Sequence, residues 1–138
     1  MEELNLYCDG GARGNPGPAA SAFVAIQKGK VIHKGSKYLG KATNNVAEYG
    51  SVLLALTWLY ENYKNYPDIK ITINLDSELV TKQMAGQYKV KNPNLKELYV
   101  QGKGIESKLS SKVIYNWTPR EKNRLADFLV NKELDKQI

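Results

Sequence analysis

The sequence predicts an α/β fold: a mixed five-stranded sheet with helices on both faces, in the order β-β-β-α-β-α-α-β-α. Three strand-like segments come first, and strands and helices alternate after them, an order that favours a sheet with both strand directions. The chain has 138 residues, which is enough to bury a core without a metal or a disulfide. We therefore expect one domain at residues 1–138.

The first three strands are predicted from alternation and from turn residues. Apolar and polar residues alternate at residues 4–8, which is typical of a strand with one buried face. A loop rich in glycine and proline is predicted at residues 10–18. Residues 19–27 and 31–39 then predict a β-hairpin that turns at residues 28–30.

The second half of the chain begins with a long helix, predicted from residue 45 to about residue 63 by helical spacing of apolar residues. Pro67 ends that region. The later elements, in order, are a strand at residues 69–75, a short helix at 77–85 closed by Gly86, a helix from Pro93 to about residue 109, a strand at 113–117 and a last helix at about 120–136.

Charge is unevenly distributed along the chain, whose formal net charge is +6. Residues 28–41 hold five lysines and no acid, and residues 82–112 hold seven lysines and two acids. Two basic stretches beside an acidic remainder suit a protein that holds a polyanion near carboxylates. Solvated lysine faces are the alternative interpretation, and composition alone does not separate the two.

The single cysteine, Cys8, excludes a disulfide within the chain and gives no indication of secretion. The first residues show no signal peptide, and no apolar run approaches the roughly 20 residues of a membrane span. We expect a cytoplasmic monomer with no membrane association and no obligate protein partner.

Four carboxylates stand where the predicted elements can bring them together: Asp9, Glu48, Asp76 and Asp127. Asp9 ends or interrupts the first strand and Asp76 closes the fourth, and a mixed sheet allows these strands to be neighbours. Glu48 begins an apolar stripe of the long helix that continues at Val52, so it is expected to face inward. Asp127 lies in the last helix, near its packed side.

Each carboxylate also has a purely structural interpretation: a turn at Asp9-Gly10-Gly11, a capping box from Asn45 to Glu48, a helix cap at Asp76, and a surface ion pair of Asp127 with Arg124 or Lys132. Taken singly, each residue fits either interpretation. Four inward-facing carboxylates with no evident buried basic partner favour a functional site.

Clustered carboxylates repel one another unless a cation joins them, and oxygen ligands favour Mg²⁺ or Mn²⁺ over zinc. A pair of such ions roughly 3.5–4 Å apart suits in-line cleavage of a phosphodiester. Histidine-based nucleophilic catalysis is poorly supported, because the only histidine, His33, lies in a lysine-rich strand far from these residues. Residues 10–17 contain neither GxGxxG nor a Walker A lysine, which excludes those nucleotide-binding loops.

Four segments in register carry a resemblance to a known family: CDGGARGNPGPA at residues 8–19, TNNVAE at 43–48, LDSELV at 75–80 and PREKNRLAD at 119–127. Together they resemble the ribonuclease H family, type I, over nearly the whole chain. The stretch GQYKVKNP at residues 86–93 resembles the short, reverse-transcriptase-like branch, which lacks the basic protrusion with which longer members grip their substrate.

The resemblance implies a ribonuclease H-like fold and an endoribonuclease that hydrolyses the RNA strand of RNA–DNA hybrids. It implies a two-metal-ion mechanism that gives 5′-phosphate and 3′-hydroxyl ends, with Mg²⁺ as the expected ion, two per site, and Mn²⁺ as a substitute. Asp9, Glu48, Asp76 and Asp127 are implied to be the catalytic metal ligands.

The resemblance also implies a substrate-binding set: Gly10, Gly11 and Asn15 along the RNA strand near its 2′-hydroxyls, and Thr43, Asn44 and Asn45 at the DNA strand and its phosphate. A glycine loop lets the backbone come close to a ligand, and small amides form hydrogen bonds without demanding a particular base. The residue chemistry is therefore compatible with these roles.

One position departs from the family pattern. Members often carry a histidine two residues before the proline of the fourth segment, where it is thought to assist proton transfer or product release; here that residue is Trp117. We expect slower or more Mn²⁺-dependent turnover, with Arg120 or Lys122 as partial substitutes. The alternatives are a catalytically impaired nucleic-acid-binding module and a protein-interaction domain that uses tyrosines 60, 63 and 66.

Overall fold

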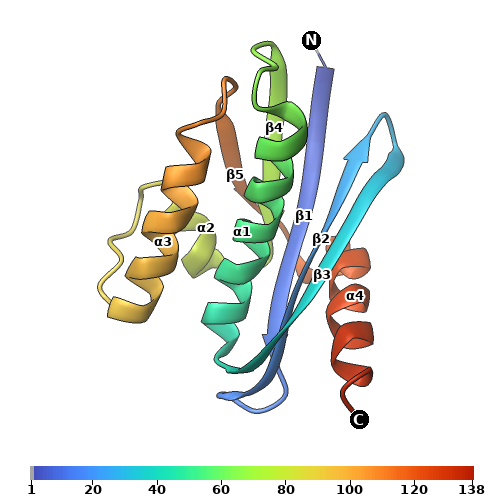
Figure 1. Ribbon diagram of the computed structural model, residues 1–138, viewed down its shortest axis with the longest axis vertical. Coiled ribbons are helices and arrows are strands. Elements are labelled where there is room, and N and C mark those ends of the chain that lie inside the picture. The colour runs from blue at the N-terminus through green and yellow to red at the C-terminus, as the bar shows by residue number, and fades with distance from the viewer. Residues whose placement is uncertain (1) are drawn as a thin grey trace.

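The computed structural model describes residues 2–138 and confirms the mixed five-stranded sheet (Figure 1). The strands are β1 (Glu2–Ala12), β2 (Gly17–Gln27), β3 (Lys30–Ala42), β4 (Ile69–Leu75) and β5 (Val113–Trp117). They lie in the order β3-β2-β1-β4-β5, so β3 and β5 form the two edges. The pairs β1–β2 and β2–β3 are antiparallel, and β1–β4 and β4–β5 are parallel.

Helices cover both faces of the sheet, as predicted (Figure 1). They are α1 (Asn44–Tyr63), α2 (Glu78–Met84), α3 (Pro93–Glu106) and α4 (Arg124–Asp135), with a 3₁₀ turn at Arg120–Lys122. The long helix α1 packs on β1 and β2 with α3 beside it, and α4 packs on the opposite face against β2 and β1. None of the helices within residues 2–138 combines the length and apolar character needed to cross a membrane.

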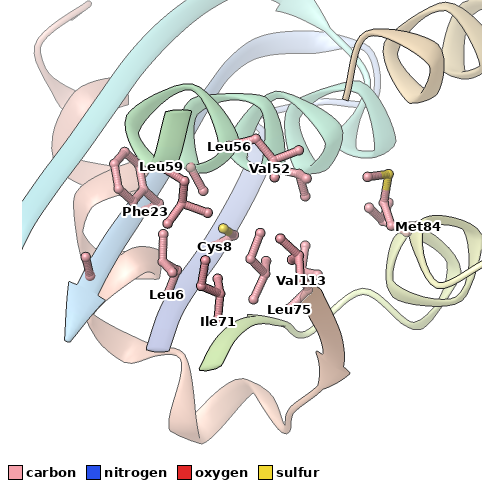
Figure 2. Close-up of a cluster of buried hydrophobic side chains, with 14 of the residues drawn as sticks. Leu6, Cys8, Phe23, Val52, Leu56, Leu59, Ile71, Leu75, Met84 and Val113 are labelled. Atoms are coloured by element: carbon pink, nitrogen blue, oxygen red, sulfur yellow. The ribbon is translucent and has the colours of Figure 1, made fainter. Parts of the chain in front are cut away.

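The main core lies between the sheet and α1 (Figure 2). The predicted alternation in β1 is confirmed, because Leu4, Leu6 and Cys8 are fully buried. Burial raises the pKa of the Cys8 thiol, so this cysteine is a neutral core residue. A smaller cluster under α4 includes Val130 and Leu134 against the alanines of β2.

The loop predicted at residues 10–18 is wrong for most of its length. Strand β1 continues through Gly10 and Gly11, which pair with Ser21 and Ala20 of β2, so that only residues 13–16 connect the two strands. The absence of a side chain at Gly10 lets the backbone of α1 pack directly against β1. A Cβ atom there would lie 2.1 Å from the carbonyl oxygen of Ala47 in α1.

Several predicted boundaries are also corrected. Strand β3 extends to residues 30–42, α3 stops at Glu106, and the last helix begins at Arg124 because residues 120–122 form a separate turn. The capping box at Asn45 is wrong, since Thr43 is the N-cap of α1 and its hydroxyl oxygen accepts a hydrogen bond from the Val46 amide at 3.2 Å. The predicted end of the short helix at Gly86 is confirmed, because Gly86 follows α2 with a positive φ of 80°.

Candidate active site

Three of the four predicted carboxylates meet at one end of the sheet. One oxygen each of Asp9, Glu48 and Asp76 lies within 4.8 Å of the other two. The parallel pairing of β1 with β4 sets Cys8 opposite Leu75, so the residues that follow them emerge side by side. Glu48 lies in the first turns of α1, which packs on one face of the sheet, and completes the group from that side. The prediction that these strands are neighbours is confirmed.

Glu48 reaches the sheet because residue 10 has no side chain. Its Oε1 accepts a hydrogen bond from the Gly10 amide at 3.0 Å, and the hydroxyl of Ser21 donates to the Ala47 carbonyl at 2.6 Å, which fastens the same turn of α1 to β2. Glu48 is only 7% exposed. Its Oε2 is buried with no hydrogen-bond partner among residues 2–138, and such an oxygen is costly unless something else satisfies it.

The electrostatics of the group favour a cation. Burial raises the pKa of Asp9 to about 7, and the charges of Asp76 and Asp127 add to the rise. Burial, and then the charge of Asp9, raise the pKa of Glu48 well above its usual range. An unpaired buried oxygen within an all-oxygen donor set fits a hard divalent ion, which would stabilise the ionised carboxylates.

Asp127 differs from the other three carboxylates, and the expectation that it faces inward is wrong. It is exposed in the first turn of α4, although it lines the same hollow of about 360 Å³ as Asp9, Glu48 and Asp76. The ion pair with Arg124 or Lys132, the alternative structural interpretation of this residue, is absent from the ion pairs of the described residues. Asp127 therefore stands at the rim, with its carboxylate open to the solvent.

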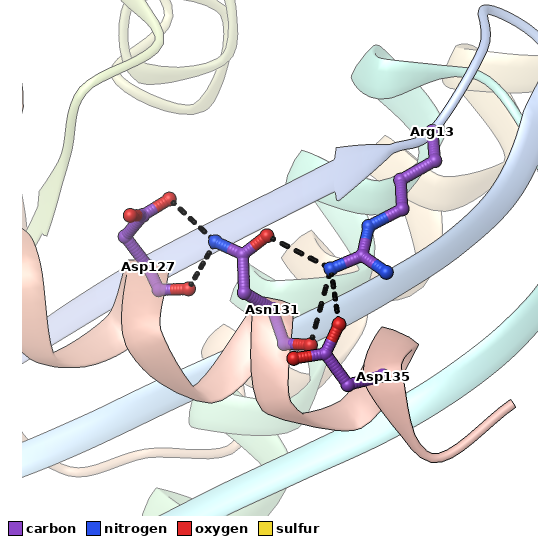
Figure 3. A network of polar contacts seen from close by, with 4 residues as sticks. All are labelled: Arg13, Asp127, Asn131 and Asp135. Carbon is purple, nitrogen blue, oxygen red and sulfur yellow. Dashed lines mark hydrogen bonds and ion pairs between the residues drawn. The ribbon is translucent and has the colours of Figure 1, made fainter. Parts of the chain in front are cut away.

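A polar network along α4 orients this rim residue (Figure 3). The amide of Asn131 donates to the backbone carbonyl of Asp127 at 3.0 Å and to its Oδ1 at 3.5 Å. Asn131 in turn accepts from Arg13 at 3.3 Å, and Arg13 pairs with Asp135 at 2.7 Å. The network thus connects the β1–β2 loop to the helix that carries Asp127, and sequence reasoning did not identify either Arg13 or Asn131 for it.

Two residues hold Asp76: Trp117, the last residue of β5, and Asn123, which follows that strand. The buried amide of Asn123 donates to the Cys8 carbonyl at 2.8 Å and to Asp76 Oδ2 at 3.4 Å. The indole N–H of Trp117, which is 50% exposed, donates to the Asp76 carbonyl at 3.2 Å. Asp76 is not a helix cap, since Ser77 caps α2. The only indication of Asn123 in the sequence is its position within the fourth family segment, PREKNRLAD at residues 119–127.

The predicted substrate-binding residues surround the same end. Gly10, Gly11, Asn44 and Asn45 line the hollow with the carboxylates. The side-chain oxygen of Asn15 accepts from the Asn44 amide at 2.9 Å, and that of Asn44 accepts from the Ala12 amide at 2.9 Å. These bonds fix the β1–β2 loop to the start of α1.

Of the two residues expected to compensate for Trp117, only Arg120 lines the hollow with the carboxylates. Lys122 lines a different hollow, with Tyr7 and Val24. The geometry therefore favours Arg120 over Lys122 as the residue near the carboxylates.

The sheet order and the carboxylates on β1, α1 and the end of β4 define a ribonuclease H-like domain. The family model described as reverse transcriptase-like matches residues 7–133. The chain belongs to the ribonuclease H family, type I, in its reverse-transcriptase-like branch.

Solved structures and relatives agree with this assignment. LC11-RNase H1, isolated from compost and solved with an RNA/DNA hybrid, is 41% identical, with 97% of this chain and 98% of that chain covered and a TM-score of 0.92. Ribonuclease HI of Halobacterium salinarum is 35% identical over 96% of this chain and 64% of its own length. A bifunctional protein of Mycobacterium tuberculosis is 38% identical over 94% of this chain, which spans only 35% of that relative.

Proposed function

We propose that this chain is an endoribonuclease that hydrolyses the RNA strand of RNA–DNA hybrids, with the whole of residues 1–138 acting as one domain. The observation that carries the proposal is the cluster of buried Asp9, buried Glu48 and half-buried Asp76, in which one Glu48 oxygen has no hydrogen-bond partner among residues 2–138. The likeness to LC11-RNase H1, solved with such a hybrid, supports this substrate.

In the proposed reaction, a water oxygen bonds to phosphorus and the bond from phosphorus to the 3′-oxygen breaks, leaving 5′-phosphate and 3′-hydroxyl ends. Asp9, Glu48, Asp76 and Asp127 would hold two Mg²⁺ ions, with Mn²⁺ as a substitute. When bound, such ions neutralise the charge that develops on the attacking and leaving oxygens. Asn123 and Trp117 keep Asp76 in place, and Asn131 orients Asp127.

The proposed substrate contacts come from both sides of the hollow. The backbone at Gly10 and Gly11, with Asn15, follows the RNA strand, where 2′-hydroxyls distinguish RNA from DNA. Thr43, Asn44 and Asn45 contact the DNA strand. Asn15 and Asn44 already use their side-chain oxygens within the protein, which leaves their amide N–H groups as hydrogen-bond donors for the nucleic acid. We further propose that the protein acts as a cytoplasmic monomer.

The test of this function uses a hybrid whose RNA strand carries a 5′ label, incubated with Mg²⁺ or with Mn²⁺. We expect cleavage of the RNA strand alone, no cleavage of single-stranded RNA or duplex DNA, and complete loss of activity in EDTA. If the protein binds the hybrid but cleaves nothing with either metal, it is the second candidate, a catalytically impaired binding module. The feature that favours this candidate is Trp117 at a position where the family often has histidine.

Trp117→His is expected to raise the multiple-turnover rate about tenfold or more and to reduce any preference for Mn²⁺, since general acid–base assistance is typically worth about 10²–10⁴-fold. Trp117→Phe is the matched control. Both substitutions remove the indole N–H that donates to the Asp76 carbonyl, but phenylalanine adds no titratable group. Equal single-turnover and steady-state rates for wild type and Trp117→His would show that this position does not limit the reaction.

A further inference from the structure

Arg13 begins the connection between β1 and β2 and reaches across to α4 (Figure 3). Its guanidinium Nη2 donates to Asp135 Oδ1 at 2.7 Å, to Asn131 Oδ1 at 3.3 Å and to the Asn131 carbonyl at 3.4 Å. Asn131 and Asp135 are one helical turn apart, and Asp127 lies one turn before them on the same edge of α4. Arg13, Asn131 and Asp127 all line the carboxylate hollow. The arginine therefore contacts the part of the helix that carries the rim carboxylate.

Arg13 sets the direction of the hydrogen bonds along this edge. A guanidinium group only donates and an ionised carboxylate only accepts, whereas the amide of asparagine has one end of each kind. With Arg13 in place, Oδ1 of Asn131 faces the guanidinium and Nδ2 faces Asp127. If the amide turned over, its oxygen would lie against the Asp127 carboxylate, and two acceptors would repel. Arg13 thus selects the orientation in which Asn131 donates to Asp127.

The connection that carries Arg13 is itself held in place. The Arg13 amide donates to the Pro18 carbonyl at 2.8 Å, which closes the turn. The turn is tight, since a Cβ atom at Gly17 would lie 2.2 Å from the Arg13 carbonyl oxygen. The Asn44 amide donates to Asn15 Oδ1 at 2.9 Å and ties the same connection to the start of α1. Arg13 therefore presents its guanidinium to α4 from a set position.

The ion pair of Arg13 with Asp135 contributes little to the stability of the fold. The two side chains are 42% and 63% exposed, and exposed ion pairs are weakly stabilising. Helix α4 is held instead by Val130 and Leu134, which are buried against the alanines of β2. Removing the guanidinium should therefore leave the helix where it is and change only the polar side chains at the rim.

We propose that Arg13 is a positioning residue, which acts through Asn131 to hold the Asp127 carboxylate in the orientation that binds a divalent ion. Asp127 depends on such support because it is exposed and has no other hydrogen-bond donor among residues 2–138. Arg13 pairs with Asp135 and not with Asp127, which leaves the Asp127 carboxylate to the metal ion. The inference rests on the proposed function for the role of Asp127 as a metal ligand.

The test replaces Arg13 with alanine and measures two quantities: Mn²⁺ affinity without nucleic acid, from thermal unfolding at increasing Mn²⁺, and the rate of hybrid cleavage against Mg²⁺ concentration. We expect weaker Mn²⁺ binding and a Mg²⁺ requirement raised on the order of tenfold, since residues that orient a metal ligand are typically worth about 10–100-fold in metal affinity. The rate at saturating Mg²⁺ should stay within about threefold of wild type, because the carboxylate remains. Arg13→Lys should recover part of the affinity, because an ammonium group also only donates.

Two further variants separate positioning from a general effect of charge. Arg124→Ala removes the same charge from an exposed position on α4 that lines a different hollow, and it should leave both measurements unchanged. In an Asn131→Ala background, Arg13→Ala should cause no further loss, because the arginine acts through Asn131. Wild-type metal binding in Arg13→Ala, an equal loss in Arg124→Ala, or additive losses in the double variant overturns the proposal. If wild type binds Mn²⁺ without cleaving the hybrid, and Arg13→Ala still weakens that binding, the proposed function fails and the role of Arg13 stands.

Discussion

Glu48→Gln is expected to lower the rate of RNA cleavage on the order of 10³-fold, in line with the loss of a group that stabilises transition-state charge. The carboxylate is one of three that lie within 4.8 Å of one another, and its Oε2 has no partner in the part of the chain that the structure describes. Glutamine keeps the shape and retains an oxygen for the Gly10 amide, but it brings no negative charge for a divalent ion.

The same variant should fold at least as stably as the wild type when no metal is present. Glutamine removes a charge from a buried group whose pKa burial already raises. Glu61→Gln is the matched control, because Glu61 lies exposed on the same helix. Thermal unfolding in EDTA and single-turnover cleavage in Mg²⁺ check both effects. Wild-type activity in Glu48→Gln would remove Glu48 from the catalytic group.

The metal-free protein is expected to lose stability as the pH rises from about 4 to above 7. The pKa of Asp9 is raised from 3.8 to about 7 in the folded protein, so the folded state binds more protons than the unfolded state across that range. The free energy of unfolding therefore falls with increasing pH. At about 1.4 kcal/mol per pKa unit, the contribution of Asp9 reaches at most about 4 kcal/mol. Glu48 acts in the same direction.

Divalent ions should reverse this loss above pH 7, because they bind the ionised carboxylates of the folded state alone. At a concentration 100 times the dissociation constant, the gain is about 2.7 kcal/mol. Urea unfolding at pH 5, 6, 7 and 8, with EDTA or Mg²⁺, measures both effects. Asp9→Asn should reduce the dependence in EDTA, and the part that remains is assigned to Glu48. A wild-type stability in EDTA that is level from pH 5 to pH 8 would contradict the raised pKa values.

Much of the candidate site was predictable because periodicity and strand order determine where a side chain points. Glu48 extends an apolar stripe and is buried, and Asp9 and Asp76 follow paired residues on parallel strands. Asp127 was misplaced because its neighbours Ala126 and Val130 are buried while Asp127 itself lies at the rim. One residue along a helix turns the side chain by about 100°, so burial of a neighbour is weak guidance.

The parts that the sequence did not predict depend on contacts between distant segments. Glycines at residues 10 and 11 suggested a turn, but the strand continues and α1 packs against it without an intervening side chain. Asn123 lies 115 positions from Cys8 in the sequence, yet its amide bonds to that carbonyl. The hydrogen bonds from Tyr49 to Gln83 and from Gln83 to the Lys89 carbonyl also depend on tertiary packing. A single sequence carries no local pattern that predicts such contacts.

Strand β3 forms an open edge of the sheet, and its backbone groups on that side are available for pairing with another strand. Four lysines, at positions 30, 34, 37 and 41, follow this edge, and its register with β2 shifts at two places. Charge and irregular register both oppose the docking of a second copy. Residues 28–41, the first basic stretch of the sequence, thus place most of their lysines along an open strand edge, where charge disfavours pairing with another strand.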